Sequence, residues 1–71
     1  MIDFGGNIRR LRQEAGVTQA ELARRVCITQ SMLCQIERGT KACSMALGAE
    51  IATALERDIT ALYSTTKEAK S

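Results

Sequence analysis

The dipeptide Thr-Gln occurs twice, at residues 18–19 and 29–30, and each copy marks the start of a short predicted helix. Threonine is a good N-cap, because its hydroxyl accepts a hydrogen bond from a first-turn amide. In "TQAE", Glu21 stands where a capping box has its reciprocal partner. Two caps eleven residues apart leave room for only one short helix and a sharp turn before the next helix.

Caps and stops elsewhere predict three more helices. Asp3 can cap a first helix that Gly16 ends, Ser44 can cap a fourth, and Asp58 can begin a short fifth. The predicted helices span about residues 4–15, 19–26, 30–38, 45–55 and 58–63. Apolar residues, most of them at helical spacing, are predicted to form the core: Phe4, Ile8, Leu11, Ala15, Leu22, Ala23, Val26, Met32, Leu33, Ile36, Met45, Ile59, Leu62 and Tyr63.

The size of the chain, 71 residues, allows one domain at most, and such a domain buries only about 60% of its unfolded surface. We expect an all-α domain over residues 1–63 and a flexible C-terminal tail over residues 64–71. No apolar run suits a membrane span or a secretory signal, which predicts a cytoplasmic protein. There, Cys27, Cys34 and Cys43 are expected to be free thiols.

The net charge is only +2, but the charges are unevenly distributed. Residues 9–41 hold seven basic and three acidic side chains, whereas residues 42–71 hold three basic and four acidic ones. The basic surplus therefore coincides with the two short helices and the helix before them. Clustered cations of this kind are the electrostatic signature of a surface that contacts phosphates.

The segment "IRRLRQEAGVTQAELARRVCITQSMLCQIERG" closely resembles the Xre/Cro family of helix-turn-helix DNA-binding proteins. Its most specific parts are "GVTQAELA" and "QIERG", and the resemblance extends over about residues 8–63. It implies a five-helix, lambda-repressor-like domain whose third helix lies in the major groove of DNA. It also implies that Gln19 contacts phosphate and that the residues facing base edges are Gln30, Ser31 and Gln35.

Hydrogen-bonding chemistry supports these assignments. A glutamine amide offers adenine a donor and an acceptor together, and each good bidentate pair contributes about 1–3 kcal/mol of discrimination. On the same face, Cys34 can contact a thymine methyl group. Phosphates instead need cations and helix amides, and Arg9 and Arg24 are among the available cations. The residues assigned to phosphate are Gln19, Thr18, Thr29, Arg10, Arg38 and Lys41.

Two further positions are predicted to join the first and third helices. Arg12 and Glu37 each lie about 70° from the centre of their apolar faces, taking about 100° per residue, which is the boundary between core and solvent. The family places an ion pair at these positions. The resemblance therefore implies a structural ion pair between Arg12 and Glu37.

The sequence departs from the family pattern at three positions. Cys27 replaces the usual glycine in the turn, where the backbone is commonly left-handed and a side chain costs about 1 kcal/mol. Gly48 and Arg57 replace aliphatic residues. At Gly48, either a backbone approaches closely or Met45 and Leu47 repack into the space.

The function expected from the resemblance is that of a sequence-specific double-stranded DNA-binding regulator, namely a repressor acting as a homodimer on a two-fold symmetric operator. RNA polymerase or a toxin protein are further candidate partners, and no cofactor is expected. The alternative function is that of an antitoxin or other protein-interaction module. For Gln30, Ser31 and Gln35, the alternative to base reading is an ordinary solvated helix face. The chain has no His and no C-x-x-C spacing, which argues against a metal site, and no catalytic motif, which argues against an enzyme.

Overall fold

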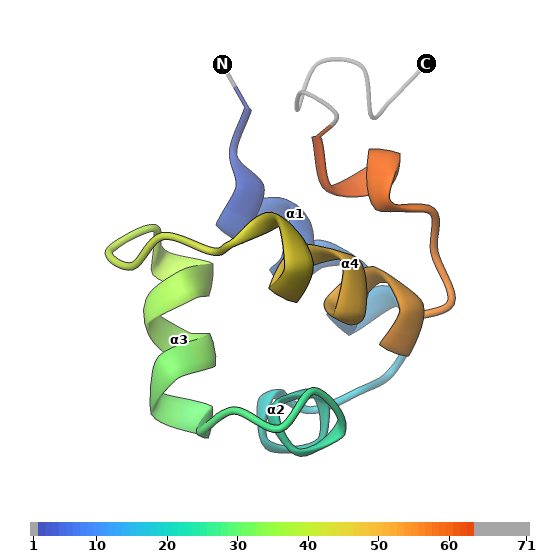
Figure 1. The fold of residues 1–71 in the computed structure, drawn as a ribbon. Helices are drawn as coiled ribbons and strands as arrows, with labels where there is room; N and C mark the ends of the chain where they lie inside the picture. Colours follow the sequence, from blue (N-terminus) through green and yellow to red (C-terminus); the bar gives the residue numbers. More distant parts are fainter. Residues whose placement is uncertain (1, 64–71) are drawn as a thin grey trace.

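The computed structural model describes residues 2–63, which form four α-helices and one 3-10 helix, with no strand in that range (Figure 1). The elements are α1 (Phe4–Glu14), α2 (Gln19–Arg25), α3 (Gln30–Arg38), α4 (Met45–Ala54) and η1 (Ile59–Tyr63). The predicted all-α class is therefore correct, and the predicted bounds of the α-helices differ from the observed ones by at most one residue. The tail expected over residues 64–71 lies outside the described residues.

The fifth predicted helix is a 3-10 helix rather than an α-helix. Residues 59–63 form a 3-10 turn, and the amide of Ala61 donates to the carbonyl of Asp58, three residues earlier, at 2.9 Å. Asp58 starts this turn as expected, because its carboxylate accepts hydrogen bonds from the amide and hydroxyl of Thr60. These bonds lower the pKa of Asp58. Five residues are too few for the repeated four-residue bonds of an α-helix.

Each α-helix begins at the predicted side-chain cap, whose oxygen accepts from a first-turn amide at 2.9 to 3.1 Å: Asp3, Thr18, Thr29 and Ser44. After the C-terminal end of each α-helix, one residue has a left-handed backbone conformation: Gly16, Cys27, Gly39 and Glu56. One half of the predicted capping box is absent, because the Glu21 carboxylate accepts from Arg24 and Arg25 and makes no bond back to Thr18. The guanidinium groups of Arg24 and Arg25, one helical turn after Glu21, are charged donors and bind its carboxylate more strongly than the backbone amide of Thr18 would.

The core consists of aliphatic side chains from all five elements: Ile8, Leu11, Leu22, Ala23, Val26, Leu33, Ile36, Ile51, Ala52, Leu55 and Leu62. Of the residues predicted to form the core, Phe4, Met32, Ile59 and Tyr63 are partly buried against it, and two are exposed. Ala15 follows the last residue of α1 and is exposed, because the chain turns away at Gly16. Met45 is 68% exposed at the start of α4, where its sulfur accepts a hydrogen bond from the hydroxyl of Tyr63.

The first helix packs against α3 and, near its N-terminal half, against η1, whereas α2 packs against α3 and α4 packs against η1 (Figure 1). The side-chain amide of Asn7 in α1 donates to the carbonyl of Leu62 in η1 at 2.8 Å. The ring of Phe4 covers Gly48, where an added Cβ would lie 3.1 Å from the ring. An aromatic side chain therefore fills the space at Gly48, rather than a backbone segment or the exposed Met45.

Candidate nucleic-acid interface

The third helix presents a polar and mostly uncharged surface. Leu33 and Ile36 are buried, whereas Gln30, Ser31 and Gln35 are exposed. The cap at Thr29 fixes the start of the helix, since its hydroxyl accepts from the amide of Met32 at 3.0 Å. Amide and hydroxyl groups on a rigid exposed helix can both donate and accept hydrogen bonds, which is what reading the edges of bases requires.

Among the four residues predicted to read bases, Cys34 is the one that is not exposed. It is half-buried and lines a groove between α1, α2 and α3. The groove is also lined by the basic residues Arg9 and Arg38 and by Gln13 and Gln19. The thiol therefore lies at the edge of the polar face of α3 and shares this groove with Arg9, Arg38 and the Arg12–Glu37 pair.

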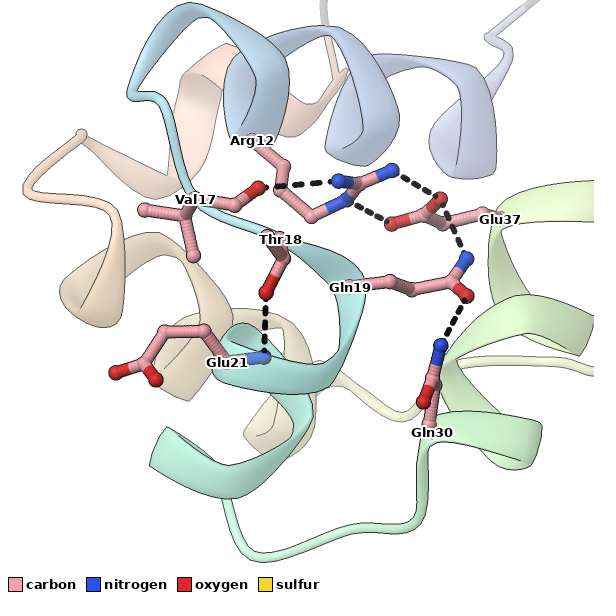
Figure 2. A network of polar contacts seen from close by, with 7 residues as sticks. All are labelled: Arg12, Val17, Thr18, Gln19, Glu21, Gln30 and Glu37. Carbon is pink, nitrogen blue, oxygen red and sulfur yellow. Dashed lines mark hydrogen bonds and ion pairs between the residues drawn. The ribbon is translucent and has the colours of Figure 1, made fainter.

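Arg12 and Glu37 form a bidentate ion pair behind this face (Figure 2). Arg12 Nε donates to Glu37 Oε2 at 2.8 Å and Nη2 donates to Oε1 at 3.1 Å. The third nitrogen, Nη1, donates to the carbonyl of Val17 at 3.0 Å. The two side chains are only 12% and 4% exposed, so the pair ties α1, the loop after it and α3 into one unit.

Gln19 extends the ion pair to the surface. Its Nε2 donates to Glu37 Oε1 at 3.1 Å, and its Oε1 accepts from Gln30 Nε2 at 3.4 Å (Figure 2). A continuous chain of hydrogen bonds thus leads from Arg12 through Glu37 and Gln19 to Gln30. The sequence did not predict the bridging position of Gln19, because side-chain contacts between α1, α2 and α3 depend on how the helices cross.

The basic side chains divide into paired and unpaired groups. Arg10 lies 3.7 Å from Glu14 and donates to Asn7, and Arg57 also pairs with Glu14. Arg24 and Arg25 both pair with Glu21, and their hydrogen bonds lower its pKa. Within residues 2–63, three basic side chains have no ion pair: Arg9, Arg38 and Lys41.

These unpaired cations include a residue that was not assigned to phosphate from the sequence. Arg9 lines the groove beside α3, whereas its neighbour Arg10, which was assigned, is engaged by Glu14. A sequence signal for this difference exists, since Arg10 has an acidic residue four positions later and Arg9 has Gln13 there.

The turn between α2 and α3 has the backbone conformation predicted for Cys27. Its φ is +62°, in the left-handed region, and its side chain is exposed. The next amide, that of Ile28, donates to the carbonyl of Ala23 at 3.0 Å, which closes the end of α2.

All three cysteines are free thiols. No helix within residues 2–63 is both long and apolar enough to cross a membrane.

Comparison with known proteins agrees with this geometry. Residues 3–62 match the model of a helix-turn-helix domain family. A curated relative, an uncharacterized HTH-type transcriptional regulator of Methanothermobacter thermautotrophicus, is 43% identical over 51 residues, which are 72% of this chain and 74% of the relative. The match to the family model includes almost all of the described residues, so it applies to all four α-helices and η1.

Solved structures show the same arrangement. The clp gene regulator ClgR from Corynebacterium glutamicum is 32% identical, with a TM-score of 0.83 over 84% of this chain, and the chain spans only 64% of ClgR. SinR, the master regulator for biofilm formation, was solved in complex with DNA and is 27% identical, with a TM-score of 0.77 over 83% of this chain and 95% of SinR. The chain therefore belongs to the Xre/Cro-type family of helix-turn-helix transcriptional regulators.

Proposed function

We propose that the protein is a sequence-specific double-stranded DNA-binding repressor. The observation that carries the proposal is the position of an exposed amide and hydroxyl face on α3 next to cations that have no partner within residues 2–63. Such a surface offers hydrogen bonds to bases and charge to phosphates from one rigid unit. The likeness to SinR, which was solved with DNA, supports α3 as the helix that meets the major groove.

Base reading is assigned to the exposed face of α3. Gln30 and Gln35 can each form a bidentate pair with adenine, and Ser31 can serve several bases. Cys34 is placed at the edge of this face and contributes apolar contact to a thymine methyl group. Since each bidentate pair contributes about 1–3 kcal/mol of discrimination, two glutamines supply most of the specificity of one half-site.

Phosphate binding is assigned to the residues around α3. Arg38 is the last residue of α3 and Lys41 lies three residues further along the chain. Arg9 joins them because it lines the same groove as Arg38 and its guanidinium has no ion pair within residues 2–63. Gln19 retains one amide hydrogen beyond its bond to Glu37, and it can donate this hydrogen to a phosphate. The backbone amides in the first turns of α2 and α3, directly after Thr18 and Thr29, can also donate hydrogen bonds to phosphate. Arg10 contributes less, because it reaches phosphate only by leaving Glu14.

Dimerisation is assigned to the surface formed by the start of α4 and by η1. Met45 is one of two large hydrophobic residues that are exposed among residues 2–63, and it lies against Tyr63. A homodimer joined there reads two half-sites about one helical turn (~34 Å) apart, which makes the operator two-fold symmetric. A repressor of this kind acts in the cytoplasm by occupying a site that RNA polymerase needs.

The proposal is tested by selecting bound sequences from random duplex DNA and footprinting the protein on the result. The expected outcome is a two-fold symmetric motif whose half-site changes when Gln30 or Gln35 is replaced by Ala. Binding should also weaken steeply with salt, since several phosphates are neutralised. A protein with no salt-dependent DNA affinity would instead be a protein-interaction module such as an antitoxin.

A further inference from the structure

We propose that Asn7 is a positioning residue for self-association: its buried amide holds η1 in the place that sets Tyr63 against Met45 on the surface assigned to the dimer. This inference rests on the proposed function, because that surface is proposed to join two copies of the chain. Within residues 2–63, Asn7 is the one polar or charged residue that is buried, with 3% of its surface exposed. A buried amide is costly unless its donor and acceptor are both bonded.

The short helix η1 depends on other elements for its position. It has five residues, of which only Leu62 is fully buried, and the hydrogen bonds of a 3-10 turn are weaker than those of an α-helix. The loop after α4 carries η1 back toward the start of α1 (Figure 1), where the ring centroids of Phe4 and Tyr63 are 5.2 Å apart. Apolar contacts have no preferred direction, so a buried leucine alone does not fix how η1 is turned.

The Asn7 amide supplies the directional contact. Its Nδ2 donates to the carbonyl of Leu62 at 2.8 Å, inside the core. Because η1 ends at Tyr63, no amide further along η1 can bond to this carbonyl. A hydrogen bond to the backbone constrains η1 both along its axis and around it. The next residue, Tyr63, is thereby held where its hydroxyl donates to the sulfur of Met45 at 3.0 Å.

Arg10 sets the orientation of the Asn7 amide from the opposite side. Its Nη2 donates to Asn7 Oδ1 at 3.3 Å, and a guanidinium has only donors, so the amide must turn its oxygen toward Arg10 and its NH2 toward Leu62. Glu14 lies 3.7 Å from Arg10 and also pairs with Arg57, in the loop between α4 and η1. One polar cluster on α1 therefore holds both the segment that leads into η1 and the end of η1.

Self-association through this surface requires η1 to be in place. Without the Asn7 bond, the carbonyl of Leu62 loses its buried donor, and η1 can leave α1 while the four α-helices keep the rest of the core. Only molecules with η1 in place can then join, so the apparent dimer affinity falls in proportion to their fraction. Base reading by α3 is unaffected, because α3 does not depend on η1 for its caps or its ion pair.

Asn7→Leu is the direct test, because it keeps the size of the side chain and removes its hydrogen bonds. Arg10→Met is a milder second variant, which removes only the group that orients the amide and keeps the test available if Asn7→Leu does not fold. The matched control is Val26→Ala, which removes buried methyl groups from α2. Met45→Lys is the control that disrupts the proposed dimer surface itself.

Sedimentation equilibrium gives the dimer dissociation constant, and tyrosine fluorescence reports on η1 alone, because Tyr63 is the only tyrosine and the chain has no tryptophan. Asn7→Leu should raise the dissociation constant by roughly 10-fold, as the loss of one buried hydrogen bond allows, and should change the fluorescence. Arg10→Met should do the same to a smaller extent, and Val26→Ala should do neither. For Asn7→Leu, affinity should fall on DNA with two half-sites and stay at the wild-type value on DNA with one.

Two different failures can be told apart. If Met45→Lys associates as wild type does, the proposed dimer surface fails and this inference fails with it. If Met45→Lys prevents association, but Asn7→Leu and Arg10→Met keep the wild-type dissociation constant and tyrosine fluorescence, only the positioning role of Asn7 is overturned. Equal weakening of the dimer by Val26→Ala would also overturn that role, since general loss of stability would then explain the effect.

Discussion

Gly5 in α1 lies directly against the carbonyl of Ile36 in α3, so that an added Cβ would overlap the Ile36 oxygen and come 2.7 Å from that of Glu37. Only a residue without a side chain allows the two helices to cross this closely. The crossing also places Arg12, two turns further along α1, within reach of Glu37. The position of α3 therefore depends on a glycine that contributes no side chain of its own.

Gly5→Ala is expected to destabilise the protein by about 1–3 kcal/mol, because backbone atoms must move to admit the methyl group. Urea unfolding measures the change. The matched control is Gly6→Ala, where the added Cβ meets only the exposed side chain of Asp3. In Gly6→Ala, the higher helix propensity of alanine offsets the weakened Asp3 cap, so the urea midpoint should change little. Equal midpoints for the two variants would contradict the close packing of α1 on α3.

Replacing Cys27 by Gly is expected to raise the urea midpoint by a stabilisation of about 1 kcal/mol, because φ is +62° and glycine adopts this region without steric cost. DNA affinity should be retained, since the turn keeps its shape. Cys27→Ala serves as the control: it removes the thiol but keeps a Cβ, so its midpoint should stay near that of wild type. A lower midpoint for Cys27→Gly would show that the turn is not strained.

Cys27 and Gly5 differ in whether the sequence predicted their structural roles. The left-handed turn at Cys27 was predicted from the family resemblance, because the family usually has glycine at this position. The role of Gly5 was not, because it depends on which backbone lies opposite, 31 residues away along the chain. The same distinction holds elsewhere. Helix caps were predicted correctly, whereas the exposure of Met45 and the ring that covers Gly48 were not.

The candidate site divides in the same way. The exposed residues of α3 follow from helical periodicity, and the family resemblance indicated the positions of Arg12 and Glu37, which the structure shows as an ion pair. The partners of individual arginines were not predicted, although the spacing of Arg10 and Glu14 offered a signal for one of them. Arg10 and Arg9 are adjacent, yet only Arg10 has an ion pair within residues 2–63, because side-chain rotamers and local acidic neighbours decide such contacts.

Arg12→Ala is expected to destabilise the protein by about 3–5 kcal/mol, because it leaves the nearly buried Glu37 carboxylate without its cation. The control is Arg57→Ala, which breaks an exposed pair with Glu14 and should cost at most about 1 kcal/mol. Urea unfolding at neutral pH distinguishes the two. If Arg12→Ala unfolds at the wild-type midpoint, the ion pair has no structural role.

The unpaired cations are expected to determine the salt dependence of DNA binding. Substituting Arg9, Arg38 or Lys41 by Gln should each reduce the slope of log K against log salt by about one and leave the preferred sequence unchanged. Arg25→Gln is the matched control, because Arg25 is held by Glu21 and by the carbonyl of Ala54. Fluorescence anisotropy over a salt series gives the slopes. An undiminished slope for Arg9→Gln would remove Arg9 from the contact surface.

The three thiols are expected to react with alkylating reagents at different rates near neutral pH. Cys27 is exposed and should be modified first. Partial burial raises the pKa of Cys43 above its ordinary value of 9.0, so the reactive thiolate is scarcer and modification should be slow. Mass spectrometry of digested protein gives the order. Modification of Cys43 before Cys27 would contradict the burial of Cys43.

Cys34 is where oxidation or alkylation should affect function, because its thiol borders the base-reading face and the groove that Arg9 and Arg38 line. Adding oxygen atoms or a carboxamidomethyl group there introduces polar bulk where apolar contact with a base is proposed. Peroxide should therefore lower the operator affinity of wild type, whereas Cys34→Ser should resist this loss. If Cys34→Ser binds like wild type but loses affinity equally on peroxide treatment, the sensitive group is another side chain and Cys34 does not approach the DNA.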